Sequence, residues 1–442
     1  MRTGIQTALA LLMIISAMSL AFIGCGGGDG DGGPVGNETI KLKFSQPHPA
    51  LPGYFGSPAS EGSIYYWEEA VETVTEGRVD IELYTSETLN KQELAYDAVN
   101  SGIADIAWCI TSYSPEWTPL SLVMYLPLDM ESCEMNYQVY HYLYEDYFAE
   151  EYAARDMLWI TPLGREQYIM FSPYKRVDTI EDFEGLTIMT SGKSMEQLIS
   201  KLGALSITLA WQDCYEALEK GTLDCSALDI TLPIVFRWFE TGDPGYIIDC
   251  GGIGNAIPHY VAQTDLLTRL RPEDVYAVLK LTDVWLGVRG SQWSDAGNIL
   301  YWDEVPKVGM EIIVWPESEK EKIRELKREV HDWWMGWMEA DYGIDRATSE
   351  AALEAVLAAM EAYDPGNKTP GNPIAYPEQW MHDRLAEFGW SCDEWDEWVG
   401  SDGHWGMDYV YKDDWEPWYE KWWDEQNMEH PWYENWKAQH GK

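Results

Sequence analysis

The sequence has few basic residues for its length. Its 442 residues include 30 lysines and arginines against 75 aspartates and glutamates, which gives a formal net charge of −45 at pH 7. Nucleic acids and anionic membrane surfaces would repel such a chain, so neither is expected as a partner. We interpret the charge as a solubilising acidic coat, as in proteins adapted to salt, with cation capture as the alternative.

Cysteine is also scarce, and the familiar catalytic motifs are missing. None of the seven cysteines shows C-x-x-C spacing, so a structural zinc site is not expected. No nucleophile elbow, phosphate-binding loop, HExxH motif or Ser/His/Asp order occurs, so the sequence predicts no catalytic residue, cofactor or metal. Apart from Cys25, six cysteines permit either disulfides in an oxidising compartment or buried thiols. These are Cys109, Cys133, Cys214, Cys225, Cys250 and Cys392.

A single apolar run suggests contact with a membrane. It covers residues 8–23 after Arg2, is short for a membrane span, and lies where a signal peptide belongs. The run ends at Gly24-Cys25, which resembles a bacterial lipoprotein box, although Phe22 stands where leucine is usual. The alternative is ordinary signal cleavage, with Cys25 as a bystander.

A glycine-rich stretch over 26–33 follows this box and would make a flexible tether. We therefore expect residues 1–24 to be removed, Cys25 to carry lipid, and residues 25–37 to tether the protein. The mature protein would then lie in the periplasm as a lipoprotein and touch the membrane only through its N-terminal lipid anchor.

The clearest pattern for the fold is an alternation of short strands and helices. Strands are expected over 185–189 and 205–209, with a third that begins at Asp224, and helices over 195–202 and 213–221. This order is βαβαβ, the unit of a parallel α/β layer, in which ligands bind at the carboxyl ends of the strands. The sequence therefore predicts an α/β fold.

The same stretch reads DFEGLTIMTSG and then KLGALSITLAWQDCYEALEKGTLD. It resembles the second lobe of the DctP-like solute-binding proteins of tripartite ATP-independent periplasmic (TRAP) transporters, and the resemblance extends over about residues 38–310. It implies a two-lobed periplasmic binding protein of type II-like fold, with long C-terminal helices, that closes over a ligand. The implied function is an extracytoplasmic receptor that delivers a small organic solute to the membrane permease subunits of a TRAP transporter.

The length and the 46% hydrophobic content allow two lobes with additional segments. Helices are expected over 272–290, 316–342 and 345–363. Eleven of the 24 tryptophans lie in the acidic segment after residue 370. We expect the following division: 38–163 as the first part of lobe 1, 164–260 as lobe 2, 261–369 as returning segments and C-terminal helices, and 370–442 as an acidic, Trp-rich extension.

Two other functions are weighed against the receptor. The Trp-rich extension could pack on the lobes as amphipathic helices, or it could bind glycans or a partner in a surface or adhesion protein. An exported hydrolase could use acidic pairs such as Asp393/Glu394. Without a catalytic motif, stray acid pairs at this charge do not support an enzyme.

Candidate ligand-binding residues are those at the ends of the expected strands and in the first turns after them. The His48 side chain could donate to a ligand oxygen or bond a backbone group, and Trp211 could stack on a ligand or pack in the core. The candidates are His48, Trp108, Tyr113, Arg165, Tyr168, Met189, Trp211 and Asp229.

Two of these positions depart from the family pattern. The resemblance implies arginines at Met189 and near Tyr168, where a planar guanidinium would grip a ligand carboxylate. Arg165 could substitute, or it could form a surface ion pair with Glu166 or Asp182.

These departures bear on the solute. We predict a neutral or aromatic solute that rests on Trp211 and is hydrogen-bonded by His48 and Tyr168. Carboxylate binding through Arg165 is the alternative.

Overall fold

A computed structural model describes residues 39–47, 64, 67–68, 70–165, 167–209, 211–242 and 245–363. Several predictions fall outside these residues: the signal peptide, the lipidated Cys25 and its tether, His48, Cys392 and the Trp-rich extension. In the part of the chain that is described, no helix is long and apolar enough to cross a membrane.

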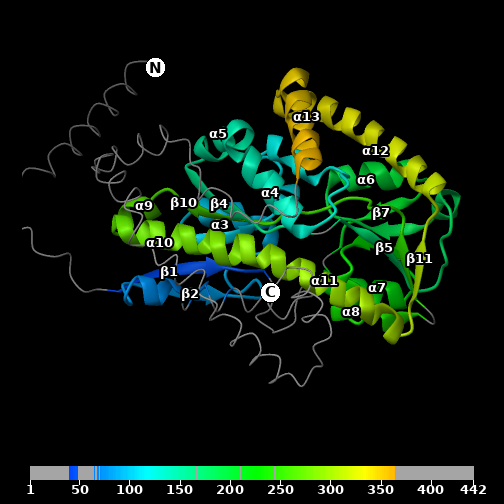
Figure 1. Ribbon diagram of the computed structural model, residues 1–442, viewed down its shortest axis with the longest axis horizontal. Helices are drawn as coiled ribbons and strands as arrows, with labels where there is room; N and C mark the ends of the chain where they lie inside the picture. The colour runs from blue at the N-terminus through cyan, green and yellow to red at the C-terminus, as the bar shows by residue number, and fades with distance from the viewer. Residues whose placement is uncertain are drawn as a thin grey trace, which may run out of the picture. The chain divides into compact units, whose positions relative to one another are not determined.

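Five strands form the first sheet, in the order β2-β1-β3-β10-β4 (Figure 1). They are β1 (Ile40–Ser45), β2 (Val79–Tyr84), β3 (Ile106–Cys109), β4 (Met157–Pro162) and β10 (His259–Gln263). β1 pairs in parallel with β2 and β3, whereas β10 runs antiparallel to both its neighbours. In β1, Leu42 and Phe44 are fully buried while Lys41 is exposed, because successive side chains of a strand point to opposite faces.

Six strands form the second sheet, in the order β11-β9-β5-β8-β6-β7. They are β5 (Ile169–Ser172), β6 (Thr187–Met189), β7 (Leu205–Ile207), β8 (Cys225–Leu228), β9 (Tyr246–Asp249) and β11 (Glu311–Val314). β6 pairs in parallel with β7 and β8, and helices α6 (Lys193–Lys201) and α7 (Trp211–Glu219) connect the three. The predicted βαβαβ unit is therefore confirmed.

The second sheet's helices begin slightly earlier than expected. The two helices were expected to begin at residues 195 and 213, but α6 begins at Lys193 after Gly192, and α7 begins at Trp211. Gly192 adopts φ of 86°, a left-handed conformation that other residues rarely take, and α6 begins directly after this turn, two residues sooner than expected.

Shorter helices cover both sheets. They are η2 (Gln92–Leu94), α3 (Ala95–Asn100), η3 (Thr111–Tyr113), η4 (Leu120–Tyr125), α4 (Cys133–Leu143), η5 (Tyr144–Phe148), α5 (Ala149–Ala153), η6 (Ile180–Phe183), α8 (Thr231–Val235), η7 (Trp238–Thr241) and α9 (Leu266–Arg269).

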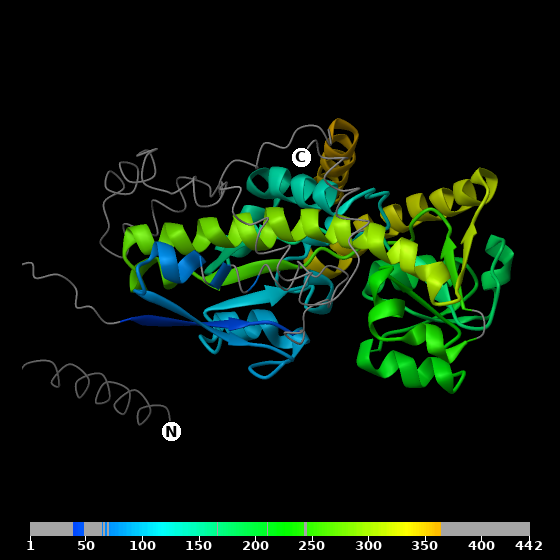
Figure 2. The ribbon, with the colours of Figure 1, turned by 60° about the horizontal axis from the view of Figure 1, so that its bottom comes forward.

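A long helix links the two sheets. It consists of α10 (Pro272–Thr282), the π-helical segment η8 (Asp283–Arg289) and α11 (Gly290–Lys307) (Figure 2). It contacts β4 of the first sheet and β11 of the second. The chain returns through α12 (Glu317–Trp337) and η9 (Met338–Tyr342) to α13 (Arg346–Ala362), which packs on α4.

The prediction that the first of these helices ends at Gly290 is wrong. A Cβ atom at Gly290 would lie 2.8 Å from Leu163 Cδ1, and one at Gly287 would lie 2.1 Å from Thr161 Oγ1. These glycines therefore allow close packing of the helix on β4 and on Leu163, which follows β4, and they do not end the helix.

The structure records five cysteines as buried thiols and not as disulfides: Cys109, Cys133, Cys214, Cys225 and Cys250. Burial raises the pKa of the Cys225 thiol to about 12, so this thiol is protonated and unreactive at neutral pH. Of the two expectations for these five residues, the buried thiol is the one observed.

The carboxylate of Glu151, a half-buried residue, holds the start of η4. Glu151 accepts hydrogen bonds from the backbone nitrogens of Leu120 at 2.6 Å and Ser121 at 3.0 Å. Burial nevertheless raises the pKa of this carboxyl to about 7. Between pH 4.5 and 7 the folded protein therefore holds a proton that the unfolded chain has released.

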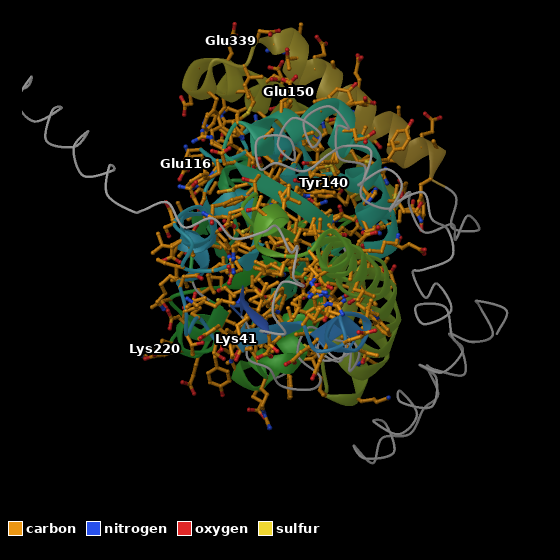
Figure 3. The ribbon with its side chains drawn as sticks, turned by 90° about the vertical axis from the view of Figure 1, so that its left-hand side faces the viewer. Lys41, Glu116, Tyr140, Glu150, Lys220 and Glu339 are labelled. Carbon is orange, nitrogen blue, oxygen red and sulfur yellow. The ribbon has the colours of Figure 1, made fainter. Side chains whose placement is uncertain are left out.

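This proton makes stability fall as pH rises from 4.5 to 7, by at most about 3 kcal/mol from this group. Glu151→Gln removes the titration, so the stability of this variant relative to wild type should improve across that range. Urea unfolding at several pH values would measure the slope. The matched control is Glu150→Gln, since Glu150 is exposed (Figure 3). If the stability of Glu151→Gln relative to wild type stays constant or falls as pH rises, the raised pKa of Glu151 is wrong.

Candidate functional site

Two chain segments that connect the sheets lie side by side. They are residues 163–168, between β4 and β5, and residues 253–258, between β9 and β10. Leu163 N donates to Pro258 O at 2.7 Å and Tyr168 N donates to Gly254 O at 2.6 Å. Because these bonds run antiparallel along both segments, they fix the positions of the side chains that the segments carry. We call this pair the crossing segments.

The first crossing segment is also tied to helices on either side. Gly164 N donates to Ser291 Oγ of α11 at 2.8 Å, and Asn136 Nδ2 of α4 donates to Arg165 O at 2.8 Å. A Cβ atom at Gly164 would lie 1.7 Å from Cys133 O, so only glycine fits there. The backbone of Arg165 is therefore held firmly at the junction.

Arg165 forms a buried ion pair with Asp229, which follows β8. Arg165 Nη2 lies 3.0 Å from Asp229 Oδ2, and each side chain is 8% exposed. The second carboxylate oxygen, Oδ1, accepts from Thr231 N at 3.2 Å and from the Thr231 hydroxyl. The predicted alternative of a surface ion pair with Asp182 is wrong: the Asp182 carboxylate accepts hydrogen bonds from the backbone of Asp178 and Thr179. Glu166 lies outside the described residues.

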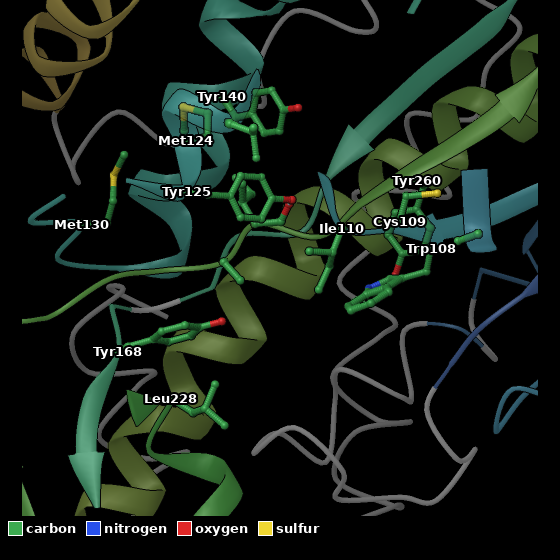
Figure 4. Close-up of a cluster of buried hydrophobic side chains, with 14 of the residues drawn as sticks. Trp108, Cys109, Ile110, Met124, Tyr125, Met130, Tyr140, Tyr168, Leu228 and Tyr260 are labelled. Atoms are coloured by element: carbon green, nitrogen blue, oxygen red, sulfur yellow. The ribbon is translucent and has the colours of Figure 1, made fainter. Parts of the chain in front are cut away.

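Tyrosines gather around this ion pair. The Tyr168 hydroxyl accepts from Ser191 Oγ at 3.3 Å. The pKa of Tyr168 is raised, mainly by burial, and the charges of Asp229 and Arg165 and the Tyr113 phenol also act on it. Burial likewise raises the pKa of Tyr260, with Arg165 opposing the shift. In Figure 4, Tyr168, just before β5, extends toward the side where Trp108 of β3 and Ile110, the next residue but one, lie.

A contact between the two sheets' loops closes one side of this region. A Cβ atom at Gly192, before α6, would lie 2.9 Å from Ser112 Cβ in η3. The turn that carries Ser191 therefore touches the 3₁₀ helix that carries Tyr113. Only a residue without a side chain allows this approach.

Several buried polar atoms here have no hydrogen-bond partner among the described residues. Both amide atoms of Asn255, on the second crossing segment, are in this state although the residue is only 1% exposed. Ser112 Oγ and Gln46 Oε1, each after a strand of the first sheet, are also unpartnered. Buried polar groups are almost always hydrogen-bonded, so these atoms can serve a polar ligand. Sequence reasoning missed all three; Asn255 lies in no motif, and what reveals it is its position one residue after Gly254, whose carbonyl accepts from Tyr168 N.

The predicted site residues fall into separate groups. Tyr113, Arg165, Tyr168 and Asp229 are brought together as described above. Met189 is 1% exposed in β6, and Trp108 is 4% exposed in β3. Trp211 begins α7, but its side chain lies outside the described part of the chain, as does His48. Contact of any of these residues with a ligand stays a prediction.

A hydrogen-bond network around a neutral histidine, His259, holds the start of β10, directly after the second crossing segment. His259 Nε2 lies 2.6 Å from the Tyr96 hydroxyl and 3.1 Å from that of Tyr152, and Nδ1 lies 3.3 Å from Ile257 O. Burial lowers the His259 pKa to about 3, so the ring stays uncharged at neutral pH. Among the described residues, no cluster of three or more His, Cys, Asp and Glu side chains could hold a metal.

Comparison with known sequences gives a consistent result. The sequence model of the bacterial extracellular solute-binding proteins, family 7, matches residues 56–335. A solute-binding protein of Chromohalobacter salexigens is 25% identical over 151 residues, which are 34% of this chain and 45% of that protein. The C4-dicarboxylate-binding periplasmic protein DctP of Rhodobacter capsulatus is 25% identical over 195 residues, which are 43% of this chain and 56% of that protein. The chain thus matches about half the length of these curated relatives.

Solved structures share the fold. A marine metagenome TRAP solute-binding protein specific for aromatic acid ligands, crystallised with 3-hydroxybenzoate, superposes with a TM-score of 0.66 at 17% identity. The match covers 74% of this chain and 99% of that one. A TRAP periplasmic solute-binding protein from Bordetella bronchiseptica with bound mandelate gives a TM-score of 0.64 at 20% identity. This match covers 74% of our chain and 100% of the Bordetella chain. The predicted fold class is confirmed by these matches.

Proposed function

Because this chain belongs to the bacterial extracellular solute-binding proteins of family 7, we propose that it is an extracytoplasmic receptor for a small organic solute. It would deliver this solute to the permease subunits of a TRAP-type transporter. The observation that carries the proposal is the cluster of Tyr113, Arg165, Tyr168 and Asp229 at the crossing segments of a fold shared with such receptors. Binding there would draw on both lobes at once.

The chemistry of the site supports binding without turnover. The charged side chains near Tyr168 are engaged with each other, and the buried His259 is neutral at neutral pH, which makes it a poor proton donor. We infer that the solute leaves the protein unchanged. Glycan binding or adhesion by the Trp-rich extension finds no support in the relatives named above.

The solute class follows in part from Met189. The thioether of Met189 has no donor and no charge with which to bind a carboxylate, and Arg165 already has Asp229 as a partner. This favours a solute that is not a simple organic acid, although the solved relatives named above include receptors for aromatic acids. A carboxylate that reached Arg165 would have to share it with Asp229.

Small-angle scattering with and without saturating solute tests the receptor function. The two lobes should close when a solute bridges the crossing segments, so the radius of gyration should fall on binding. Mass spectrometry of the same mixture should return the solute intact. Equal radii at saturation, or a chemically altered solute, would count against the proposal.

We also propose that the receptor is a periplasmic lipoprotein, anchored through Cys25 after loss of residues 1–24. The Gly24-Cys25 box and the glycine-rich stretch after it support this. Palmitate fed to expressing cells should label the wild-type protein, and Cys25→Ala should abolish the label. Undiminished labelling of the variant would refute the anchor.

A further inference from the structure

We propose that the solute is a zwitterion, such as an amino acid or a betaine, whose carboxylate meets Arg165 and whose cationic nitrogen meets Asp229. The inference rests on the proposed receptor function and names its ligand class. It starts from the ion pair between Arg165 Nη2 and Asp229 Oδ2, 3.0 Å apart and almost wholly buried.

Charge balance is the first argument. The positive charge of the guanidinium and the negative charge of the carboxylate cancel, so the Arg165–Asp229 pair has no net charge. A ligand with a carboxylate alone would bury a second negative charge beside Asp229, which is unfavourable in a poorly solvated site. A zwitterion adds no net charge and places each of its groups beside the residue of opposite sign.

The remaining polar groups suit the same ligand. An ammonium has three donors, and beyond Asp229 the region offers the Tyr168 hydroxyl and Asn255 Oδ1, the latter without a partner among the described residues. Asn255 Nδ2, equally unpartnered, can donate to a carboxylate oxygen. A methylated nitrogen could instead lie against the aromatic rings of Tyr113 or Tyr260, by cation–π attraction.

A neutral solute explains the site less well. Hydroxyls and amides would suffice for a sugar or polyol, whereas a buried ion pair is costly to desolvate and seldom stabilises a fold by itself. By comparison, the ion pair of Arg176 with Asp178 in the same lobe leaves those side chains 44% and 52% exposed. Arg165 lies on a crossing segment, and its ion pair with Asp229 is buried. A buried pair at this place suits a site that recognises a charged solute.

The test uses four pools of compounds in thermal-shift assays on the full-length protein. The pools contain amino acids and betaines, mono- and dicarboxylates, primary and quaternary amines, and sugars and polyols. We expect the largest shift with the first pool. A shift only with acids, amines or polyols overturns the zwitterion but leaves the receptor function standing, whereas no shift with any pool counts against both.

The best zwitterion is then compared with its two single-charge analogues by calorimetry. If it is phenylalanine, the analogues are 3-phenylpropionate and phenethylamine; if it is proline, they are cyclopentanecarboxylate and pyrrolidine. The zwitterion should bind at least about tenfold more tightly than either, since each analogue leaves one charged residue without its new partner. Equal affinity for the carboxylate-only analogue would overturn the inference without any variant.

The selectivity should reverse in Asp229→Asn. This change leaves Arg165 without its carboxylate, so the variant should lose zwitterion affinity and gain affinity for the carboxylate-only analogue. The matched control is Asp178→Asn, the same chemical change at an exposed ion pair, which should behave as wild type. Unchanged selectivity in Asp229→Asn would contradict the proposed role of Asp229.

Discussion

Gly164→Ala is expected to destabilise the protein by about 3 kcal/mol or more, at the upper end of what overpacking costs. The new methyl group would lie 1.7 Å from the backbone oxygen of Cys133, which cannot rotate away as a side chain could. Either α4 or the crossing segment would have to move. Movement of the segment would also break the bond from Gly164 N to Ser291 Oγ and displace Arg165.

Urea unfolding measures this loss, and Gly336→Ala is its control. Gly336 lies inside α12, and a Cβ atom there would meet nothing within 4 Å. Alanine is the better helix former, so the control should be more stable than wild type by about 0.5 to 1 kcal/mol. If Gly164→Ala were as stable as wild type, the close packing of the crossing segment against α4 would be wrong.

Arg165→Met should destabilise the protein by about 3 to 5 kcal/mol, as when one partner of a buried ion pair is removed. The Asp229 carboxylate would stay buried, and among the described residues Thr231 alone would still donate to it.

Adding Asp229→Asn should recover most of that stability, because the amide oxygen can still accept from Thr231 while the buried charge is gone. Unfolding of the two single variants and the double variant gives the coupling energy directly. A double variant no more stable than Arg165→Met would show that Arg165 supports the fold by some other contact. The recovered double variant should still fail to bind solute.

The sequence was sufficient for the parts of the fold whose signals are local. The βαβαβ unit follows from apolar runs and glycine stops within one stretch, and the resemblance found there is confirmed by the family match. The predicted helix end at Gly290 was wrong because the sequence cannot distinguish a glycine that ends a helix from a glycine that allows another segment to pack closely. Only the position of Leu163 distinguishes the two.

The site was less accessible because its partners are far apart in the chain. Arg165 and Asp229 are 64 residues apart, and their pairing depends on the path of the crossing segment and not on a motif. That Met189 departs from the family pattern stays a prediction, and the residue itself is buried in β6. Asn255 carries no signal of its own, since its importance arises from its lack of partners in the folded chain.

The most direct test is to identify what the purified protein carries. Wild type and the double variant Arg165→Met/Asp229→Asn would be purified without denaturation from cells grown in rich medium. Each would then be denatured, and the released small molecules would be quantified by mass spectrometry. We predict one zwitterionic solute in stoichiometric amount from wild type and none from the double variant. No solute from wild type, or the same amount from both proteins, would contradict binding at Arg165 and Asp229.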